Sequence, residues 1–320
     1  MLVSLQEEEL PLPAPSGSVA SVGVFDGVHR GHREILRTNV ARARELGARP
    51  TVVTFREHPK TVLLGRAPRM LTSLEHKLEL FRRAGIEHAV ALQFDAALRD
   101  VSAAEFARGF LVGRLGAKKL VLGFDSKLGH GREGTPEFLR ALGLDVEVVG
   151  QVLVGERPVS STAIREAVEL GDLEGAARML GRRVAVYGDV VRGNQLGRKL
   201  GFPTANLDLH HELRPPIGVY AGFARPILPP GRTPGRRWPA VVNIGFRPTV
   251  TGVRPEAPHV EAHLLGFEGD LYGAHLELEF VGRLRDEQRF PDVGSLQRQI
   301  ELDVSRARAL LAAQPTDEGG

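Results

Sequence analysis

The first half of the chain alternates short, continuous apolar runs with longer segments of helical periodicity. Continuous apolar runs are typical of strands buried on both faces, and helices between such strands return the chain so that the strands lie parallel. The expected strands are 18–25, 51–55, 88–92, 119–123 and 146–149, and the expected helices are 34–46, 73–84, 103–115 and 162–180. This pattern predicts a doubly wound parallel sheet, in which ligands bind at the carboxyl ends of the strands.

From residue 184 onward the apolar runs are shorter, and glycine and proline clusters separate them. That spacing is typical of an antiparallel β-barrel. The expected strands are 184–191, 218–224, 239–244, 259–265 and 276–281, and a closing helix follows Ser295 with Leu296, Ile300, Val304, Ala307 and Leu311 on one face. We therefore expect an α/β chain of two domains, the parallel-sheet domain over 1–181 and the barrel with its closing helix over 182–320.

Composition narrows the class of protein. Hydrophobic residues make up 42% and charged residues 25% of the chain, as in ordinary globular proteins. No apolar run approaches the roughly 18 residues of a membrane span, and residues 6–9 are acidic or amidic, so we expect neither a membrane partner nor a signal peptide. The absence of cysteine excludes disulfides and thiolate metal sites and favours a cytoplasmic location. The small net charge of +3 favours small anionic ligands over nucleic acid.

Two histidines stand in a glycine-broken turn directly after the first expected strand. The turn runs from Gly23 through Gly27 to His29 and His32, where a helix is expected to begin. Glycine lets the backbone approach a ligand closely, and a helix N-terminus offers unpaired N–H groups to an anion. This turn is therefore a candidate phosphate site with His29 and His32 as donors.

Two more segments of the first half belong with this turn. Asp125 follows an expected strand and leads into the glycines of 129–131, while Ser161 and Thr162 open an expected helix that carries Arg165. Ser161 is the expected N-cap, and hydroxyls with an arginine at a helix start are suited to a triphosphate. Any one of these features alone is more often an ordinary helix cap or chance. Three of them at strand ends or helix starts favour a nucleotide site.

The order of these motifs resembles the adenylyltransferase half of the bifunctional bacterial riboflavin kinase/FAD synthetase family. The resemblance begins with residues 25–32 and 161–165 and continues through the second half of the chain. There it is carried by 188–193, 197–206, 218–221, 243–249, 260–263, 270–273 and 285–290. The run Pro203-Thr204-Ala205-Asn206 is highly specific. The resemblance implies a nucleotidyltransferase domain followed by a riboflavin kinase barrel.

For the barrel, the resemblance implies that Glu261 takes the proton from a ribityl hydroxyl of riboflavin. From spacing alone a solvent-facing strand glutamate is the favoured interpretation, and only the surrounding motif changes it. The segment 193–199 lacks the spacing of a Gly-x4-Gly-Lys-Ser/Thr phosphate loop, so its glycines are expected to form a different loop over ATP. The expected ATP-binding residues are Gly193, Gly197, Arg198 and Gly201, those for Mg²⁺ are Thr204 and Asn206, and those for flavin are Tyr220, Arg285, Glu287 and Phe290.

For the first domain, the resemblance implies that the phosphate of FMN attacks the α-phosphorus of ATP and that pyrophosphate leaves. No protein nucleophile is required, so the expected catalytic groups, His29, His32 and Arg165, stabilise charge on the phosphates. The expected ATP-binding residues are Gly23, Phe25, Asp26, Gly27, Ser161 and Thr162, and Asp125 is expected to contact ribose or flavin.

The chain departs from the family pattern where Ser126 and Leu128 stand in place of aromatic residues. We expect a cytoplasmic enzyme, a monomer or weak homo-oligomer, that uses Mg²⁺ and ATP to convert riboflavin to FMN and then FMN to FAD. One alternative is a riboflavin kinase with a weak adenylyltransferase half. Another is a flavin-responsive binding protein without turnover, against which the intact Thr204, Asn206 and Glu261 argue.

Overall fold

The computed structural model describes residues 1–5, 10, 15–193, 197, 200–210, 212–227, 236–246 and 258–314. The chain forms two compact units, Met1–Ser161 and Thr162–Gly320, and each is described by itself. Helix α7 (Ser161–Leu170) begins at the division between them, and α8 (Leu173–Leu180) belongs to the second unit. The expected domain boundary at 181/182 stays a prediction.

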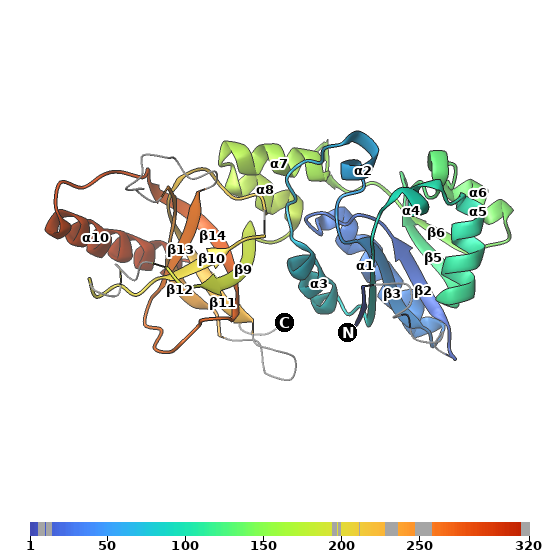
Figure 1. Ribbon diagram of the computed structural model, residues 1–320, viewed down its shortest axis with the longest axis horizontal. Helices are drawn as coiled ribbons and strands as arrows, with labels where there is room; N and C mark the ends of the chain where they lie inside the picture. The colour runs from blue at the N-terminus through green and yellow to red at the C-terminus, as the bar shows by residue number, and fades with distance from the viewer. Residues whose placement is uncertain are drawn as a thin grey trace. The chain divides into compact units, whose positions relative to one another are not determined.

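Six parallel strands form the sheet of the first unit, in the order β1-β4-β3-β2-β5-β6. Figure 1 labels β3, β2, β5 and β6. The strands are β1 (Leu2–Ser4), β2 (Ser18–Val22), β3 (Arg49–Phe55), β4 (His88–Leu92), β5 (Ala117–Gly123) and β6 (Val146–Val149). The helices are α1 (Arg30–Glu45), α2 (Lys60–Leu64), α3 (Leu74–Arg83), α4 (Ala96–Asp100), α5 (Ala103–Glu105), the π-helical η2 (Phe106–Arg114), the short η3 (His130–Arg132) and α6 (Pro136–Ala141). A hairpin of β7 (Leu153–Val154) and β8 (Arg157–Pro158) precedes α7. The strand order reverses between β2 and β5, which is where ligands bind in such sheets.

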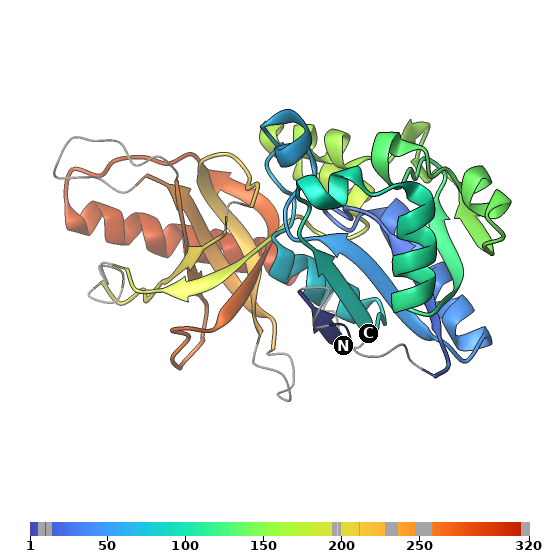
Figure 2. The same ribbon diagram turned by 45° about the vertical axis from the view of Figure 1, so that its right-hand side comes forward.

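Both faces of this sheet are covered, which explains why its strands are apolar without alternation. Val53 and Val90 lie in a core cluster with η2, which crosses one face of the sheet (Figure 2). Their neighbours Val52 and Ala89 lie in a second cluster with Leu36 of α1 and with α3. Successive residues of a strand point to opposite faces, so each strand supplies both cores. The expected doubly wound sheet is confirmed.

The second unit is a closed antiparallel barrel with strand order β10-β13-β12-β11-β14-β9. The strands are β9 (Ala185–Val191), β10 (Ala205–Asp208), β11 (Gly218–Ile227), β12 (Trp238–Gly245), β13 (His259–Leu264) and β14 (His275–Arg285). Helix α10 (Val293–Ala312) packs Ala307 and Leu311 against Val219 and Phe223 of β11. The expected barrel and closing helix are confirmed.

The structure differs from the expected elements in a few places. The helix expected over 162–180 is two helices, because Gly171 adopts φ 79° and the side chain of Asp172 caps α8 by accepting from the N–H of Gly175. Strands β1 and β10 were not expected, since their three and four residues are too short to show a period. Within the described ranges, no helix is long and apolar enough to cross a membrane.

His88 makes the stability of the first unit depend on pH. Its side chain is buried at the start of β4, where Nε2 lies 3.1 Å from the hydroxyl of Ser4 on β1. Burial, with the charge of Arg49, lowers the pKa of His88 to about 4 from its ordinary 6.5. Between these two values, His88 is protonated in the unfolded chain but neutral in the folded chain. The contribution of His88 to the free energy of unfolding is therefore present above pH 6.5 and is lost as the pH falls toward 4, by at most about 1.4 kcal/mol per pH unit.

We expect His88→Gln to remove this part of the pH dependence. Chemical denaturation of both proteins between about pH 7 and about pH 4.5 measures it. The stability of the parent protein should fall more steeply over this interval than that of the variant. Equal slopes would show that His88 does not carry the effect.

Candidate active sites

The turn between β2 and α1 has an unusual backbone. Phe25, Gly27 and Val28 have φ values of 51°, 79° and 38°. Positive φ is uncommon for residues other than glycine and is a genuine outlier for a β-branched residue such as Val28. Each such residue costs about 1–3 kcal/mol and persists only where its surroundings hold it, typically at functional sites. The turn lies at the strand-order reversal, where sheets of this kind generally bind ligands.

Hydrogen bonds from a distant segment hold this turn. The carboxylate of Asp26 is 2% exposed and accepts from the backbone N–H groups of Leu71 at 2.8 Å and Thr72 at 3.2 Å. The N–H of Gly27 donates to Oγ1 of Thr72 at 3.1 Å, and the carbonyl of Asp26 accepts from the hydroxyl of Ser161 at 3.0 Å. The side chain of Asp26 therefore supports the turn, and its expected contact with ATP stays a prediction.

The structure brings His29 and His32 together at the start of α1. Their rings stack with centroids 3.6 Å apart and planes 16° apart. His29 is the N-cap of the helix, and its Nδ1 accepts from the N–H of His32 at 3.4 Å. In neutral His29 the proton is therefore on Nε2, which makes this nitrogen a donor. A Cβ at Gly31 would lie 3.3 Å from the His29 ring, so glycine leaves room for it.

The other residues expected around this turn have clear positions. The buried ring of Phe25 makes T-shaped contacts with the rings of Phe81 and His32, so it supports the histidine. The N–H of Gly23 donates to the carbonyl of Val53 on β3. Ser161 is the first residue of α7, not the residue before it as an N-cap would be. The phosphate roles expected for Thr162 and Arg165 on the same helix stay predictions.

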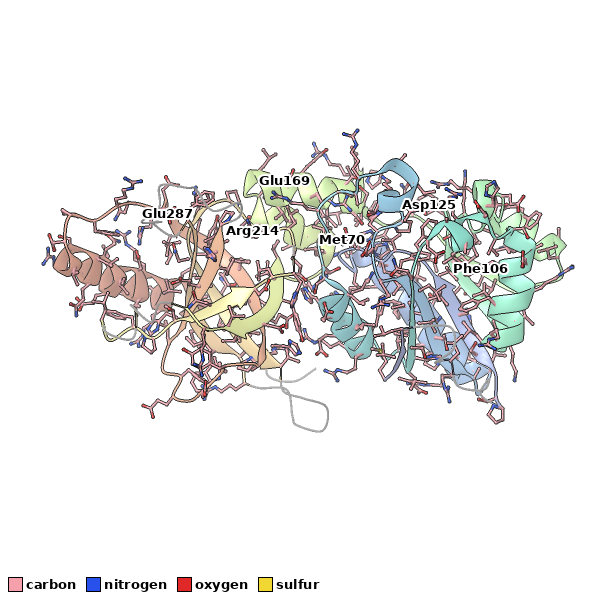
Figure 3. All side chains as sticks on the ribbon, viewed as in Figure 1. Met70, Phe106, Asp125, Glu169, Arg214 and Glu287 are labelled. Carbon is pink, nitrogen blue, oxygen red and sulfur yellow. The ribbon has the colours of Figure 1, made fainter. Side chains whose placement is uncertain are left out.

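Asp125, labelled in Figure 3, is exposed just beyond the carboxyl end of β5. Its neighbour Leu128, however, is buried in the core cluster that contains Phe106 and Phe110. The loop around Leu128 packs closely on the start of α5. The backbone of Gly129 lies so near Ala103 that a Cβ on Gly129 would collide with it. Leu128 therefore fills a core position, whereas Asp125 lies exposed at the carboxyl edge of the sheet.

Sequence reasoning missed a cavity of about 660 Å³ near the carboxyl end of β4. Its apolar and aromatic lining includes Leu92, Leu98, Val101, Phe106 and Phe110, and its charged lining includes Arg56, Asp95, Glu105 and Arg114. The rings of Phe106 and Phe110 stack at 5.2 Å on the π-helical segment, where Phe106 is labelled in Figure 3. π-Helical stretches are rare in proteins, and those that occur are often found at functional sites. The one feature of the sequence that could have indicated this cavity is the pair Phe106 and Phe110 with Gly109 between them.

In the barrel, the register of the strands places three polar residues in one row. Asn206 of β10 pairs with Glu261 of β13, and Glu261 pairs in turn with Asn243 of β12. Directly paired residues project from the same face of a sheet. The neighbours Val260 and Ala262 are fully buried, so Glu261 projects away from the barrel interior. Sequence reasoning found Asn206 and Glu261 but gave no role to Asn243.

Glycines bring the preceding loop close to this row. A Cβ at Gly193 would collide with the side-chain amide of Asn206, and one at Gly197 would collide with the carbonyl of Phe202 and lie 3.4 Å from the Thr204 hydroxyl. Gly201 adopts φ 85°. Arg198 lies outside the described residues. The oxygen donors of Thr204 and Asn206, with backbone this close, fit a hard cation such as Mg²⁺ carried by a nucleotide.

Three of the expected flavin residues lie beyond one end of this row. Arg285 shares a pairing partner with Asn243, because Val219 pairs with both. Its guanidinium forms a 2.8 Å ion pair with buried Asp303 of α10 and lies 5.7 Å from the centroid of the Phe290 ring. Glu287, labelled in Figure 3, packs against Gly245 at the end of β12.

Tyr220 differs from these three residues. It is 1% exposed, its hydroxyl donates to the carbonyl of Pro216 at 2.6 Å, and its ring packs edge-on against Phe280. The structure gives this ring a core-packing role. Its expected contact with flavin stays a prediction.

Comparison with known proteins supplies independent information. Residues 12–163 match the family model described as FAD synthetase, and residues 180–311 match the one described as riboflavin kinase. The chain is 39% identical to the bifunctional riboflavin kinase/FMN adenylyltransferase of Pseudomonas fluorescens, over 94% of this chain and 95% of that protein. It is 37% identical to the enzyme of the same name from Escherichia coli K12, over 91% and 92%.

Among solved structures, the chain resembles one described as a macrolide-efflux protein from Streptococcus pneumoniae. The TM-score is 0.78 at 29% identity, over 96% of this chain and 98% of that one. Full-length identity above 30% to curated enzymes, together with two family-model matches in the expected order, decides the assignment. The chain belongs to the family of bifunctional riboflavin kinase/FMN adenylyltransferases.

Proposed function

We propose that the barrel of this chain phosphorylates riboflavin to FMN and that its parallel-sheet unit adenylylates FMN to FAD. The observation that carries the proposal is that each compact unit holds its own polar constellation. The stacked histidines lie in Met1–Ser161, and the row of Asn206, Glu261 and Asn243 lies in Thr162–Gly320. The two family-model matches divide the chain in the same order.

In the kinase reaction, Glu261 accepts the proton of the terminal ribityl hydroxyl as that oxygen attacks the γ-phosphorus of ATP. A phosphorus–oxygen bond forms to riboflavin, the bond to the β-phosphate oxygen breaks, and ADP leaves. General-base assistance of this kind contributes about 10²–10⁴ in rate. Thr204 and Asn206 are the residues that would hold Mg²⁺, which offsets phosphate charge when bound. Asn243, beside Glu261 in the row, is placed to orient its carboxylate.

In the adenylylation reaction, a phosphate oxygen of FMN attacks the α-phosphorus of ATP and pyrophosphate leaves. His29 and His32 donate hydrogen bonds to the oxygens on which negative charge develops. Because Nδ1 of His29 accepts a hydrogen bond at the helix cap, Nε2 carries the proton of the neutral ring and is the donor. The N-terminal N–H groups of α1 add to the same attraction for an anion.

We infer that the cavity beside β4 receives the flavin ring of FMN. Its volume of about 660 Å³ lies in the range of small-molecule sites, and its lining joins stacked phenylalanines with a few charged groups. Arg56 follows β3, the strand next to β2, so the cavity borders the same edge of the sheet as the histidine turn. Phe106 and Phe110 then supply the aromatic surface that Ser126 and Leu128 lack. This favours an active adenylyltransferase over the alternative of a weak one.

We further propose that the enzyme acts in the cytoplasm, as a monomer or weak homo-oligomer, on riboflavin, FMN and ATP. The support for the substrates is the family, and that for the location is the biosynthetic role of its bacterial relatives.

The two activities should separate by mutation. We expect Glu261→Gln to lower FMN formation from riboflavin at least about 10²-fold, because an amide does not accept the hydroxyl proton. FAD formation from supplied FMN should stay within about twofold, since Glu261 lies in the other unit. Chromatography of the products formed with ATP and Mg²⁺ gives both rates.

The matched variant for the first unit is His29→Asn. Asparagine keeps an N-cap hydrogen bond to the helix but removes the imidazole. FAD formation should fall at least about tenfold while FMN formation stays unchanged. Loss of both activities in either folded variant would contradict the division of labour.

A separate test concerns the flavin cavity. Arg56→Gln removes a charged group from its lining, and we expect it to raise the KM for FMN in adenylylation about 3- to 30-fold. Arg44→Gln is the control, because Arg44 is also exposed, lies on α1 and does not line the cavity. Steady-state kinetics at saturating ATP compare them. An unchanged KM in Arg56→Gln would place the flavin elsewhere.

A further inference from the structure

A lysine lies almost completely buried beneath the histidine turn. Lys77 of α3 is 1% exposed, although lysine is among the residues least often buried. Burial lowers the pKa of Lys77 to about 8, against the opposing charges of Asp26 and Glu75. The amine therefore remains mostly protonated at neutral pH. A buried charge is unfavourable unless its surroundings satisfy it, so its partners indicate what it does.

Its partners are the backbone carbonyls at the ends of two neighbouring strands. Nζ donates to the carbonyl of Val24 at 3.1 Å and to that of Phe55 at 3.1 Å. Phe55 is the last residue of β3, and Val24 follows the end of β2 and immediately precedes the strained turn. Thr54 adds a further hydrogen bond to the Val24 carbonyl, from its hydroxyl at 3.2 Å. Lys77 thus sets where the chain leaves β2.

The same short segment holds the turn at two more places. The backbone of Leu71 and Thr72 binds the carboxylate of Asp26, and the hydroxyl of Thr72 accepts from the N–H of Gly27. Residues 71–77 therefore contact Val24, Asp26 and Gly27, a stretch that includes Phe25 and Gly27, two of the three residues of the turn with positive φ. Without such bonds a backbone of this kind relaxes to a more favourable conformation.

We propose that residues 71–77 form a positioning segment for adenylylation, in which Lys77 and Thr72 hold the turn so that His29 and His32 meet the reacting phosphates. This inference rests on the proposed function of the first unit. Both residues are 1% exposed, so neither is assigned a contact with substrate. Each acts through the backbone of the turn, whose last residue, His29, is the N-cap of α1. Because the histidines act on charge that develops during the reaction, a displaced turn lowers kcat more than it weakens ATP binding.

The first test replaces Lys77 by methionine, which is apolar and similar in length. We expect kcat for FAD formation to fall about 10- to 100-fold, as displacement of catalytic groups by about 1 Å does, while the dissociation constant for ATP changes less than about threefold. The substitution also removes a hydrogen-bond donor from the carbonyls of Val24 and Phe55 and a positive charge from beside Asp26, so the thermal midpoint should fall. The kinetics are therefore measured well below the midpoint of the variant, where the protein is folded, which separates positioning from loss of folded protein.

Thr72 supplies a second, gentler pair of variants. Thr72→Val keeps the shape and removes the hydroxyl that accepts from Gly27, whereas Thr72→Ser keeps the hydroxyl. We expect the valine variant to lose at least about fivefold in kcat for FAD formation and the serine variant to stay within about twofold of the parent protein. This pair decides the question if Lys77→Met does not fold.

Two controls accompany these variants, the kinase activity of each variant and a substitution elsewhere on the same helix. Riboflavin kinase activity reports on the other unit and should be unchanged in every variant. Glu79→Gln alters the same helix at a residue whose carboxylate binds Arg82 and Arg83 instead of the turn, and it should leave adenylylation within about twofold.

The outcomes separate the inference from the proposed function. A parent protein that forms no FAD from FMN and ATP would overturn both. A parent protein that forms FAD, with full kcat in folded Lys77→Met and in Thr72→Val, would overturn only the positioning segment. So would a loss of kcat in Lys77→Met that equals the fraction of protein unfolded at the assay temperature, or an equal loss in Thr72→Ser and Thr72→Val.

Discussion

The carboxylate of Asp26 and the two backbone amides that it binds are the interaction on which the first site depends. The turn after β2 contains two residues other than glycine with positive φ, a backbone that local interactions alone do not maintain. Hydrogen bonds that N–H groups donate to a carboxylate are about twice as strong as neutral ones, and this carboxylate is shielded from water. Because the bonds come from residues 71–72, the turn depends on a segment that is 45 positions away along the chain.

In the barrel, a different constraint positions the polar residues of the candidate site. There the positions of Asn206, Glu261 and Asn243 follow from strand register, since a slip by one residue would turn Glu261 into the barrel interior. Closure of the barrel leaves no free strand edge along which such a slip is easy. The buried ion pair between Arg285 and Asp303 ties the end of β14 to α10. In both sites, therefore, the polar groups stand on backbone that is held in position by distant segments of the same unit.

Several features escaped sequence reasoning for identifiable physical reasons. Asp26 appears in the motif as a ligand-facing acid, yet its partners lie 45 residues away and no local pattern reveals them. Tyr220 lies in a family motif, but its burial depends on Phe280 of the neighbouring strand β14 and on the carbonyl of Pro216. The cavity beside β4 is formed by three segments, and the π-helical geometry of η2 has no distinct periodic signature.

The sequence by itself determined the class of fold, the order of the two units and the family. Those properties follow from the period of apolar residues and from compact motifs, both of which are local along the chain. Tertiary structure alone decided how His29 and His32 stack, that Asn243 adjoins Glu261, and that Lys77 lies under the turn. The reason is that hydrogen bonds and register between distant segments are set by the packing of the whole unit. A local pattern can place a residue on an element, but it cannot specify which distant residue it meets.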